Sequence, residues 1–500
     1  DAAWDEQHAL RLSAQSAGDW LWLSDSAPDG VKSCPPSAAH TLLGQDILHG
    51  VFDARHSLNV EALAAFSGTL KAGSWLVLLV PEWHAWAERP DADSLRWSEQ
   101  PQAIPTPRFI RRFQSLLEQD TSVTLWRQDL PFNLTPLPVA PDWLPPDGQP
   151  TTEQAQILQQ LMQAQSGVWV LTASRGRGKS TLAGMLARQW PGCCWVSAPA
   201  KASASQILNQ ATESARFIAP DTLLALCRAG DVAGADWLII DEAAAIPAPM
   251  LAEIIAAFPR VLLTTTVQGY EGTGRGFLLK FCASLPQWHD LRLNAPIRWS
   301  SCDTLEPFIS ELLLFEEHLP DAEQTRGASE IFPIEAEDWL NNPKLLQDFY
   351  GLLSSAHYRT SPLDLRRLLD APGMTFIASQ HKNTLAGALW LVEEGGLSAE
   401  LAQDVWAGRR RPRGNLVAQS LAAHAGFPEA AVLRSRRITR IAVHPAFRRQ
   451  GIARDLLVMQ KQHAQQAGLD FLSVSFGYTA ELASLWQQAG LRLARISMQK

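Results

Sequence analysis

Short apolar runs alternate with amphipathic segments along most of the chain, which is typical of strands that alternate with helices. The first stretch has predicted strands at 19–24 (DWLWLS), 50–53 (GVFD) and 75–80 (WLVLLV), and a predicted helix at 59–70 (NVEALAAFSGTL). This order favours a small α/β domain with a partly parallel sheet over residues 1–145. No catalytic constellation is visible in it, and Arg108, Arg111 and Arg112 on the next helix could contact a phosphate backbone or be only solvated.

A proline-rich connector separates this first domain from the next. It runs from Pro131 to Pro150 and contains seven prolines, at 131, 136, 138, 141, 145, 146 and 150. Proline fixes φ and lacks a backbone donor, so such a run favours neither helix nor central strand and marks a boundary. We expect a second domain over 151–320 and a third over 330–500.

The second domain opens with a hydrophobic strand pattern that breaks into a loop rich in glycine and arginine, GVWVLTASRGRGKST at 167–181. Apart from an alanine at its first glycine, the nucleotide-binding P-loop pattern is matched. Gly176 and Gly178 let backbone N–H groups turn toward phosphate oxygens, which the positive end of the following helix also attracts. Lys179 would reach the β- and γ-phosphates, and the Ser180 hydroxyl would bind Mg²⁺. The alternative is a glycine-rich turn with a solvated lysine.

Two acids strengthen the P-loop interpretation. In ADWLIIDEAA at 236–245, a hydrophobic strand ends in Asp241 and Glu242. Open α/β sheets bind their ligands at the carboxyl ends of the strands. Asp241 would hold magnesium, directly or through water, and Glu242 would orient or deprotonate the attacking water. A further predicted strand, WVSAP at 195–199, lies between this pair and the P-loop.

Other polar residues of this domain have two possible roles each. Thr264 to Thr266 and Gln268 follow a buried strand pattern and could sense the γ-phosphate, although threonine also simply favours strands. Gln154 could offer its amide to the base of the nucleotide or cap the helix that begins there. Arg298 and Arg275 are further candidates for a γ-phosphate contact.

The third domain has a different pattern. RITRIAVHPAFRRQGIARDLL at 437–457 indicates a strand, a short loop and a helix. Upstream, 376–395 (FIASQHKNTLAGALWLVEEG) has the pattern of paired strands, and downstream 470–477 (DFLSVSFG) is a further strand. A closing helix at 481–491 and a last strand, LRLARIS, complete the prediction.

Charge is distributed unevenly. The net charge is −8, which argues against a uniformly basic nucleic-acid binder. Between Val405 and Arg454, however, eleven arginines stand against one acid, Glu429. Such density predicts a polyanionic partner whose affinity falls as salt rises, although a solvated face is the alternative.

Composition restricts the class of protein. The chain has 500 residues, which favours about three domains, and 46% of them are hydrophobic. The run at 75–80 is too short to cross a bilayer, and the first residues carry no secretory signal pattern. The six cysteines show neither C-x-x-C nor metal-ligand spacing. We therefore expect a cytoplasmic protein.

The loop at 448–453 (RRQGIA) resembles the acetyl-CoA loop, R-x-x-G-x-A, of the GCN5-related N-acetyltransferase (GNAT) fold. There, backbone amides at a helix N-terminus bind a pyrophosphate, Gly451 permits close approach, and Ala453 leaves room. Many enzymes of this fold place a tyrosine on the closing helix to protonate the thiolate, where this chain has Trp486. Tyr478 could substitute, or the thiolate could leave without an acid.

A P-loop domain followed by such a domain, with RIAVHP, GRRRPRGN at 408–415 and SVSFGYT at 473–479, resembles the bacterial tRNA(Met) cytidine acetyltransferases over nearly the whole chain. The resemblance implies a multidomain α/β fold, with a small α/β domain, a helicase-like parallel-sheet ATPase and a mixed α/β GNAT domain. It implies acetyl transfer from acetyl-CoA to N4 of the wobble cytidine of elongator tRNA(Met), accompanied by ATP or GTP hydrolysis with Mg²⁺. A C-terminal RNA-binding region is also expected of the family.

The resemblance also implies site residues. For the nucleotide they are Gln154, Gly176, Arg177, Gly178, Lys179, Ser180, Thr181, Leu182, Ala183, Gly184, Met185 and Arg298. For acetyl-CoA they are Ile441, Ala442, Val443, Arg448, Arg449, Gln450, Gly451, Ile452, Ala453, Arg454 and Glu481. A further family arginine on the last helix is replaced by Gln488.

The chemistry agrees with this assignment. Cytosine N4 is a poor nucleophile, so orientation and polarisation of the thioester must supply much of the acceleration, for which a backbone N–H near Val443 is a candidate. His444 could accept the N4 proton or be a loop histidine without a chemical role. The segment Arg409–Arg440 is expected to contact tRNA. Alternatives are a protein N-acetyltransferase with an ATPase module, and an RNA-remodelling ATPase that only senses acetyl-CoA.

Overall fold

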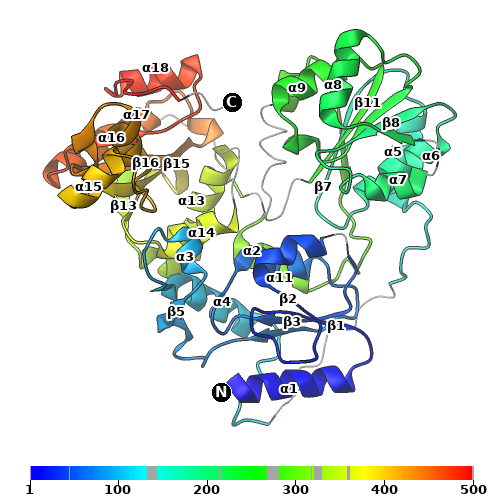
Figure 1. Cartoon of the computed structure of the whole chain (residues 1–500), viewed down its shortest axis with the longest axis horizontal. Helices are drawn as coiled ribbons and strands as arrows, with labels where there is room; N and C mark the ends of the chain where they lie inside the picture. Colours follow the sequence, from blue (N-terminus) through cyan, green and yellow to red (C-terminus); the bar gives the residue numbers. More distant parts are fainter. Residues whose placement is uncertain are drawn as a thin grey trace.

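The computed structural model describes residues 2–43, 45–131, 143–211, 213, 215–266, 281–316, 318–319, 322, 329–356 and 361–497. Three larger sheets follow one another along the described residues (Figure 1). We refer to residues 2–131 as the N-terminal region, 151–293 as the P-loop region and 329–497 as the C-terminal region. Gln268 and Arg275, named above as candidate phosphate contacts, lie outside the described residues.

The N-terminal region contains a four-stranded parallel sheet in the order β2-β1-β3-β4. Its strands are β1 (Trp20–Leu23), β2 (Ser33–Cys34), β3 (His49–Asp53) and β4 (Leu76–Leu79), and β5 (Pro90–Asp91) pairs with β6 (Ile104–Pro105). Its helices are α1 (Ala2–Gln15), α2 (Val60–Ser67), α3 (Ser94–Trp97) and α4 (Pro107–Gln119). Alternate residues of β1 face opposite ways: Trp22 packs with Ala9 of α1, whereas Leu21 and Leu23 face the core that contains α2 and α4.

The P-loop region contains a six-stranded parallel sheet in the order β12-β7-β11-β10-β8-β9. The strands are β7 (Gly167–Ala173), β8 (Cys194–Ser197), β9 (Ala215–Phe217), β10 (Trp237–Ile240), β11 (Arg260–Thr266) and β12 (His289–Leu293). One face is covered by α5 (Thr152–Met162), α6 (Lys179–Gln189) and α7 (Ser205–Ala211), the other by α8 (Pro220–Ala229) and α9 (Ala248–Ile255). Since β7, β11 and β10 are neighbours and parallel, the segments after their carboxyl ends come together.

The C-terminal region contains a five-stranded sheet in the order β13-β14-β15-β16-β17, antiparallel except for the pair β16–β17. The strands are β13 (Glu330–Ile334), β14 (Met374–His381), β15 (Thr384–Gly395), β16 (Arg434–Val443) and β17 (Phe471–Val474). The helices are α12 (Asp338–Asn341), α13 (Pro343–Ala356), α14 (Pro362–Asp370), α15 (Ala399–Trp406), α16 (Leu416–His424), α17 (Ile452–Gln466) and α18 (Ala480–Gln488). Leu456 of α17 packs with Leu389 on one face, and α13 contacts β15 and β16.

The predicted last strand, LRLARIS, is wrong. Residues 491–497 have no regular secondary structure, and Leu493 and Ile496 are exposed. Their alternating pattern resembles a strand, but a strand needs a neighbour for its backbone groups, and none pairs with this segment among the described residues.

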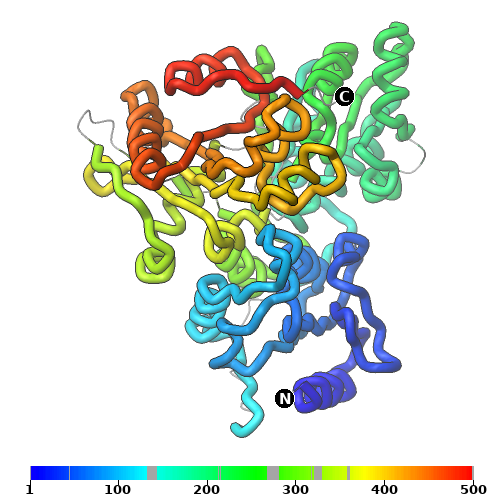
Figure 2. The backbone as a smooth tube through the Cα atoms, turned by 60° about the vertical axis from the view of Figure 1, so that its left-hand side comes forward, coloured from blue at the N-terminus to red at the C-terminus, as the bar shows by residue number. Residues whose placement is uncertain are grey.

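The N-terminal and C-terminal regions share one hydrophobic core. Helix α11 (Leu305–Leu313) contributes Phe308 and Leu312 to a cluster that also contains Phe113 of α4, Phe349 of α13 and Leu365 of α14. Figures 1 and 2 both show the yellow α14 beside the blue and cyan N-terminal helices. The P-loop region is thus inserted into a body built from both ends of the chain, and segments 131–150 and 294–304 connect it to that body.

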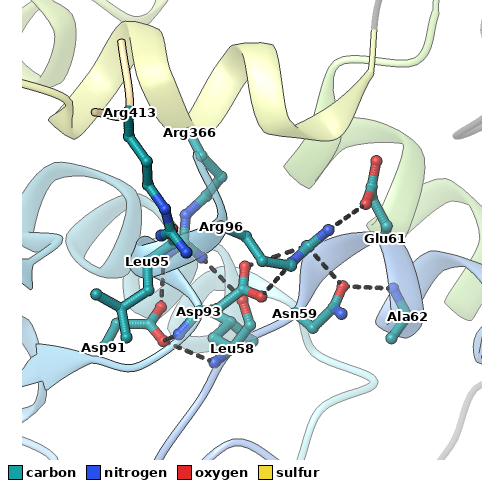
Figure 3. A network of polar contacts seen from close by, with 10 residues as sticks. All are labelled: Leu58, Asn59, Glu61, Ala62, Asp91, Asp93, Leu95, Arg96, Arg366 and Arg413. Carbon is teal, nitrogen blue, oxygen red and sulfur yellow. Dashed lines mark hydrogen bonds and ion pairs between the residues drawn. The ribbon is translucent and has the colours of Figure 1, made fainter. Parts of the chain in front are cut away.

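Polar contacts also connect the N-terminal and C-terminal regions at this junction (Figure 3). Arg366 of α14 is fully buried, lies over the rings of Trp97 and Phe109, and its Nη2 is 2.5 Å from Asp91 Oδ2. Asp370 accepts hydrogen bonds from the backbone N–H groups of Arg108 and Phe109, both at 2.9 Å, and so caps the start of α4.

Candidate functional sites

The P-loop residues form a phosphate cradle between β7 and α6. Gly176 and Gly178 have φ values of 77° and 79°, a left-handed conformation that favours glycine. A Cβ on Gly178 would lie 2.5 Å from Gln154 Nε2, so another residue here would be strained in its backbone and would displace the Gln154 side chain. Lys179 is the first residue of α6, whose N-terminus therefore faces the loop.

The predicted acid pair meets the P-loop. Lys179 Nζ lies 2.7 Å from Glu242 Oε1, and Ser180 Oγ lies 3.1 Å from Asp241 Oδ2. Glu242 has a positive φ of 49°, unusual for a residue other than glycine, which turns its side chain toward the loop beyond β10. Ser180 and Asp241 together offer the oxygen donors that Mg²⁺ prefers, so the residues fit that ion.

The pKa values of the two carboxyl groups are shifted in opposite directions. Burial raises the pKa of Asp241, and the Lys179 ammonium with hydrogen bonds from Thr264 and Ser180 opposes this only in part. Burial also acts on Glu242, but the Lys179 charge and the hydrogen bonds from Lys179 and Thr266 outweigh it and lower the pKa of Glu242. Glu242 is therefore the carboxyl that is held ionised.

The strand-end threonines contact these acids. Thr264 Oγ1 donates to Asp241 Oδ1, and Thr266 donates from Oγ1 to Glu242 Oε1 at 2.8 Å and from its backbone N–H to Oε2 at 3.2 Å. The threonines thus do more than satisfy strand propensity, because they connect β11 to both acids.

Gln154 makes the capping contacts that were one of its two expected roles. Thr151 and Gln154 form a reciprocal capping box at the start of α5. The Gln154 amide also donates to the carbonyl of Gly178 at 3.0 Å, and the side chain is buried. The Gln154 side chain therefore helps to hold the P-loop backbone in place through the carbonyl of Gly178.

The rest of the implied nucleotide set divides between exposed and packed positions. Thr181 accepts a hydrogen bond from Gln206 at 3.4 Å, whereas Leu182, Ala183 and Met185 are buried in the core. Gly184 is where α6 meets α7, since a Cβ there would lie 2.4 Å from Gln210 Cβ. The last four residues thus fix the helix that presents Lys179 and Ser180.

The two arginines of the set contact residues outside the P-loop. Arg177 forms an ion pair with Glu306 at 2.9 Å. Arg298 forms one with Asp46 of the N-terminal region at 3.2 Å and donates to the carbonyl of Gly68 at 3.3 Å. No sequence pattern connects Asp46 or Gly68 to Arg298, so sequence reasoning missed both.

The second candidate site lies where β16 and β17 part. The pairing of β16 with β17 ends at Ile438 and Val474, while β16 continues to Val443 beside β15. On that edge, the backbone from Thr439 to Val443, which includes Ile441 and Ala442, has no strand partner among the described residues. Such an edge offers N–H and C=O groups to an extended ligand with amide groups.

The loop beyond this strand forms a second anion cradle. Arg449 and Gly451 have φ values of 60° and 86°, and Gly451 is the N-cap of α17. Backbone N–H groups in such a loop, with a helix N-terminus behind them, fit a pyrophosphate. Arg448, Arg449 and Gln450 are exposed, Ile452 is buried, and Ala453 is half-buried in the first turn. Arg454 pairs with Asp455 at 3.0 Å.

His444 has the contacts of a loop histidine. Its ring is buried, and Nδ1 accepts a hydrogen bond from the backbone N–H of Ala446 at 3.1 Å, which begins the turn Pro445–Phe447. In the neutral ring, an accepting Nδ1 leaves the proton on Nε2, which then cannot serve as a base. These contacts favour the structural role over proton acceptance.

The residues considered as proton donors to the thiolate, and those around them, lie on the closing helix or just before it. Glu481 lies in the first turn of α18 and is exposed, Trp486 is buried against Phe476, and Tyr478 is exposed just before the helix.

The basic segment divides into two groups of arginines. Arg437 pairs with Glu394 at 2.6 Å and Arg440 with Asp364 at 2.6 Å, and Arg436 approaches Glu393 at 3.5 Å. These acids lie outside the segment, which is why its charge count alone overstates the free charge. The exposed arginines are 409, 410, 411, 413, 434, 448, 449 and 454, of which Arg409 pairs with Asp404 and Arg454 with Asp455. These exposed arginines are the members of the segment that are most accessible to a polyanion.

The arginines of α4 are used for packing. Arg108 donates to the carbonyl of Leu369 at 3.1 Å, Arg112 to that of Leu312 at 3.3 Å, and Arg111 pairs with Glu88. Arg108 thus joins α4 to α14 and Arg112 joins it to α11, whereas Arg111 forms an exposed ion pair. In the described residues, no group of three or more His, Cys, Asp or Glu side chains could hold a metal, and no helix is long and apolar enough to cross a bilayer.

Family models match each region of the chain. Residues 1–128 match the tRNA(Met) cytidine acetyltransferase TmcA, N-terminal model; residues 170–316 match RNA cytidine acetyltransferase NAT10/TcmA, helicase domain; and residues 348–457 match GNAT acetyltransferase 2. The three models follow the order of the three sheets.

Whole-chain relatives have high identity. The chain is 60% identical over 505 residues to tRNA(Met) cytidine acetyltransferase TmcA of Yersinia pestis, with 100% of this chain and 72% of the relative covered. Identity to the protein of the same name from Photorhabdus asymbiotica is 57%, and to that from Salmonella typhimurium 51%, each over 99% of this chain and 72% of the relative.

Proposed function

The chain belongs to the tRNA(Met) cytidine acetyltransferase family, and from this premise we propose that it transfers an acetyl group from acetyl-CoA to N4 of the wobble cytidine of elongator tRNA(Met). We further propose that its P-loop region hydrolyses ATP or GTP with Mg²⁺ to assist this transfer. One observation carries the proposal: a single chain holds two anion cradles, one around Lys179 and one at Gly451.

The transfer needs two substrates to be oriented together. N4 attacks the thioester carbon, the N–C bond forms, the C–S bond breaks, N4 loses a proton and the thiolate leaves. The free edge at Thr439–Val443 positions the thioester arm, and a backbone N–H near Val443 polarises its carbonyl. The cradle at 448–454 holds the pyrophosphate. We propose that His444 supports the turn through its contact with the backbone N–H of Ala446 and that another group accepts the N4 proton.

The cytidine must leave the base stack to reach this edge, which costs a few kcal/mol. We assign the grip on the RNA backbone to the exposed arginines of the segment Arg409–Arg440 and not to Arg436, Arg437 and Arg440, which are paired with acids. Nucleotide hydrolysis would place or remodel the anticodon stem.

The P-loop region would hydrolyse the nucleotide with its own residues in these roles. Ser180 and Asp241 would hold Mg²⁺, which neutralises developing phosphate charge when bound. In the structure Lys179 is paired with Glu242. Phosphate oxygens would draw Lys179 from this pair and leave Glu242, which Thr266 still orients, to position the attacking water.

The test separates the acceptors. Protein, labelled acetyl-CoA and nucleotide are incubated with tRNA and with a protein pool, and nucleosides from the tRNA are analysed by mass spectrometry. N4-acetylcytidine at the wobble position supports the proposal. Label in the protein pool, or RNA-stimulated hydrolysis without transfer to any acceptor, contradicts it.

Two variants test the cradles separately. Gly451→Val is expected to abolish acetyl-CoA binding because valine is strained at φ 86° and crowds Arg454. Lys179→Ala is expected to abolish nucleotide turnover and lower acetylation at limiting tRNA. Arg188→Ala, at the exposed far end of α6, is the matched control and should do neither. Unchanged acetylation in Lys179→Ala would show that turnover and transfer are not coupled.

A further inference from the structure

A pocket of about 210 Å³ lies between the N-terminal region and the P-loop region. One wall is the end of α2 and the loop that follows, with Ser67, Gly68, Lys71 and Ser74. The opposite wall contains Ser174 and Arg175 of the P-loop and Thr266 of β11, and residues 299–315 complete the lining. The pocket is therefore built from segments that are distant in sequence and belong to different regions.

The P-loop wall connects directly to the proposed nucleotide site. Thr266 donates to Glu242, and Glu242 is paired with Lys179 at 2.7 Å. In a P-loop site the lysine reaches the β- and γ-phosphates, and the acid after the neighbouring strand positions water at the γ-phosphate. The pocket thus opens at the terminal-phosphate end of the site, and its volume exceeds that of several waters at about 30 Å³ each.

The charges around the pocket favour an anion on the N-terminal side. The acids in its lining are already engaged: Glu306 is paired with Arg177 and accepts from Trp299 Nε1 at 3.1 Å, and Asp303 accepts from the backbone N–H of Glu306. In the part of the chain that the structure describes, the Lys71 side chain is exposed and has no ion-pair partner. Lys71 is therefore the cationic side chain of the N-terminal wall that can turn toward a ligand in the pocket.

A second contact ties the same wall to a nucleotide-site arginine. Arg298 pairs with Asp46 at 3.2 Å and donates to the carbonyl of Gly68. Gly68 lies three residues before Lys71 in the same wall of the pocket. The N-terminal wall and the nucleotide site are therefore in contact before any ligand binds.

We propose that the wall formed by residues 67–74 is the second half of the nucleotide site, with Lys71 binding the terminal phosphate of a nucleoside triphosphate and Asp46 holding Arg298 while no nucleotide is bound. The inference rests on the proposed nucleotide hydrolysis and adds a binding residue from outside the P-loop region. It also names what the nucleotide would do. A triphosphate held from both sides fastens the P-loop region to the body that carries the acetyl-CoA cradle, and loss of the terminal phosphate releases it.

The test compares triphosphate with diphosphate. Affinities of the full chain for a non-hydrolysable ATP analogue and for ADP are measured by calorimetry in wild type, Lys71→Ala, Lys71→Arg and Lys32→Ala. Lys32 is an exposed lysine of the same region that does not line the pocket, and serves as the matched control. Lys71→Ala is expected to weaken the triphosphate about tenfold and ADP less than about twofold, as loss of one charged contact to the terminal phosphate predicts. Lys71→Arg should retain most of the difference.

The outcomes are separable. If Lys71→Ala keeps the wild-type ratio of triphosphate to diphosphate affinity, the inference is overturned while the P-loop assignment stands. If wild type binds neither nucleotide, the proposed nucleotide site itself is overturned. Because Lys71 is exposed, its replacement leaves the core intact, and equal unfolding temperatures of Lys71→Ala and Lys32→Ala confirm this.

Discussion

The N-terminal region has two junctions of opposite character. Toward the C-terminal region it shares a hydrophobic core, and the ion pair of Arg366 and Asp91 is sealed inside it. Toward the P-loop region it offers a half-exposed ion pair, Arg298 with Asp46, and a pocket. Buried apolar contacts hold one geometry, whereas exposed ion pairs contribute little stability and can exchange partners. We conclude that the junction with the C-terminal region holds a single geometry, whereas the junction with the P-loop region can rearrange.

The strongest way to break the first junction is Arg366→Met. The change leaves the Asp91 carboxylate buried without its partner, and the expected loss of unfolding free energy is about 3–5 kcal/mol. Denaturant unfolding followed by tryptophan fluorescence measures it. Arg111→Met is the control, because Arg111 of α4 pairs with Glu88 and both side chains are exposed, by 55% and 65%, so a loss below about 1 kcal/mol is expected. Equal losses would contradict the contrast. Adding Asp91→Asn to Arg366→Met removes the unpaired charge but keeps an acceptor for the backbone N–H groups of Leu58 and Asp93, and should restore part of the stability.

Helix α14 connects the first junction to β16, whose free edge at Thr439–Val443 is the proposed acetyl-CoA site. Asp364 pairs with Arg440 of β16, and it also accepts from the backbone N–H of Ser361. Asp364→Asn keeps the cap but loses the charge, so β16 is held less firmly. A KM for acetyl-CoA about threefold higher is expected, as follows from somewhat under 1 kcal/mol of lost positioning. Steady-state kinetics test this, and nucleotide turnover measured in parallel should not change. A matching fall in both activities would point to general damage instead.

The second junction should respond in binding rather than in stability. Asp46→Asn removes the charge that holds Arg298, and the unfolding free energy should change by less than about 1 kcal/mol because the pair is exposed. Arg298 is then free to turn to phosphate, and triphosphate affinity should rise about two- to threefold. Calorimetry measures both nucleotides, with Asp29→Asn, an exposed acid of the same region, as control. A fall in affinity would mean that Asp46 orients Arg298 rather than competing for it.

The smallest expected effect concerns pH. Burial raises the pKa of Asp370 above its ordinary value of 3.8, against the hydrogen bonds from Phe109 and Arg108. The folded state then binds more protons than the unfolded state as pH falls from the raised pKa toward 3.8. The stability of wild type relative to Asp370→Asn should therefore decrease as pH rises through that window and become constant above it. Unfolding midpoints of both proteins between pH 4 and pH 7 test the sign.

The contacts at the carboxyl ends of the P-loop region's strands followed from sequence because their signals are local. A strand, a glycine loop and a strand-end acid pair each have a signature, and parallel strands bring such ends together, as the contacts of Lys179 with Glu242 and of Ser180 with Asp241 illustrate. The contact of Gln154 with the carbonyl of Gly178 did not follow from sequence.

Long-range partners did not follow from sequence. An apolar stripe on α11 predicts a buried face but not which element covers it, and Phe308 and Leu312 pack on the N-terminal region rather than on the sheet that precedes them. The arginines of 405–454 suggested one polyanion surface, yet Glu394 and Asp364, which pair with Arg437 and Arg440, lie outside that window. Charge density is a local property, and ion pairing is not.

The shared core has a consequence for synthesis on the ribosome. Phe109 and Phe113 emerge early, but α11 and α14, which cover them, follow roughly two hundred residues later or more. At bacterial elongation rates this interval is on the order of tens of seconds. The inserted P-loop region can complete its own hydrophobic cores in that time. The middle of the nascent chain would therefore fold before its N-terminal region does. The half-covered face of α4 is then the surface on which a chaperone would act.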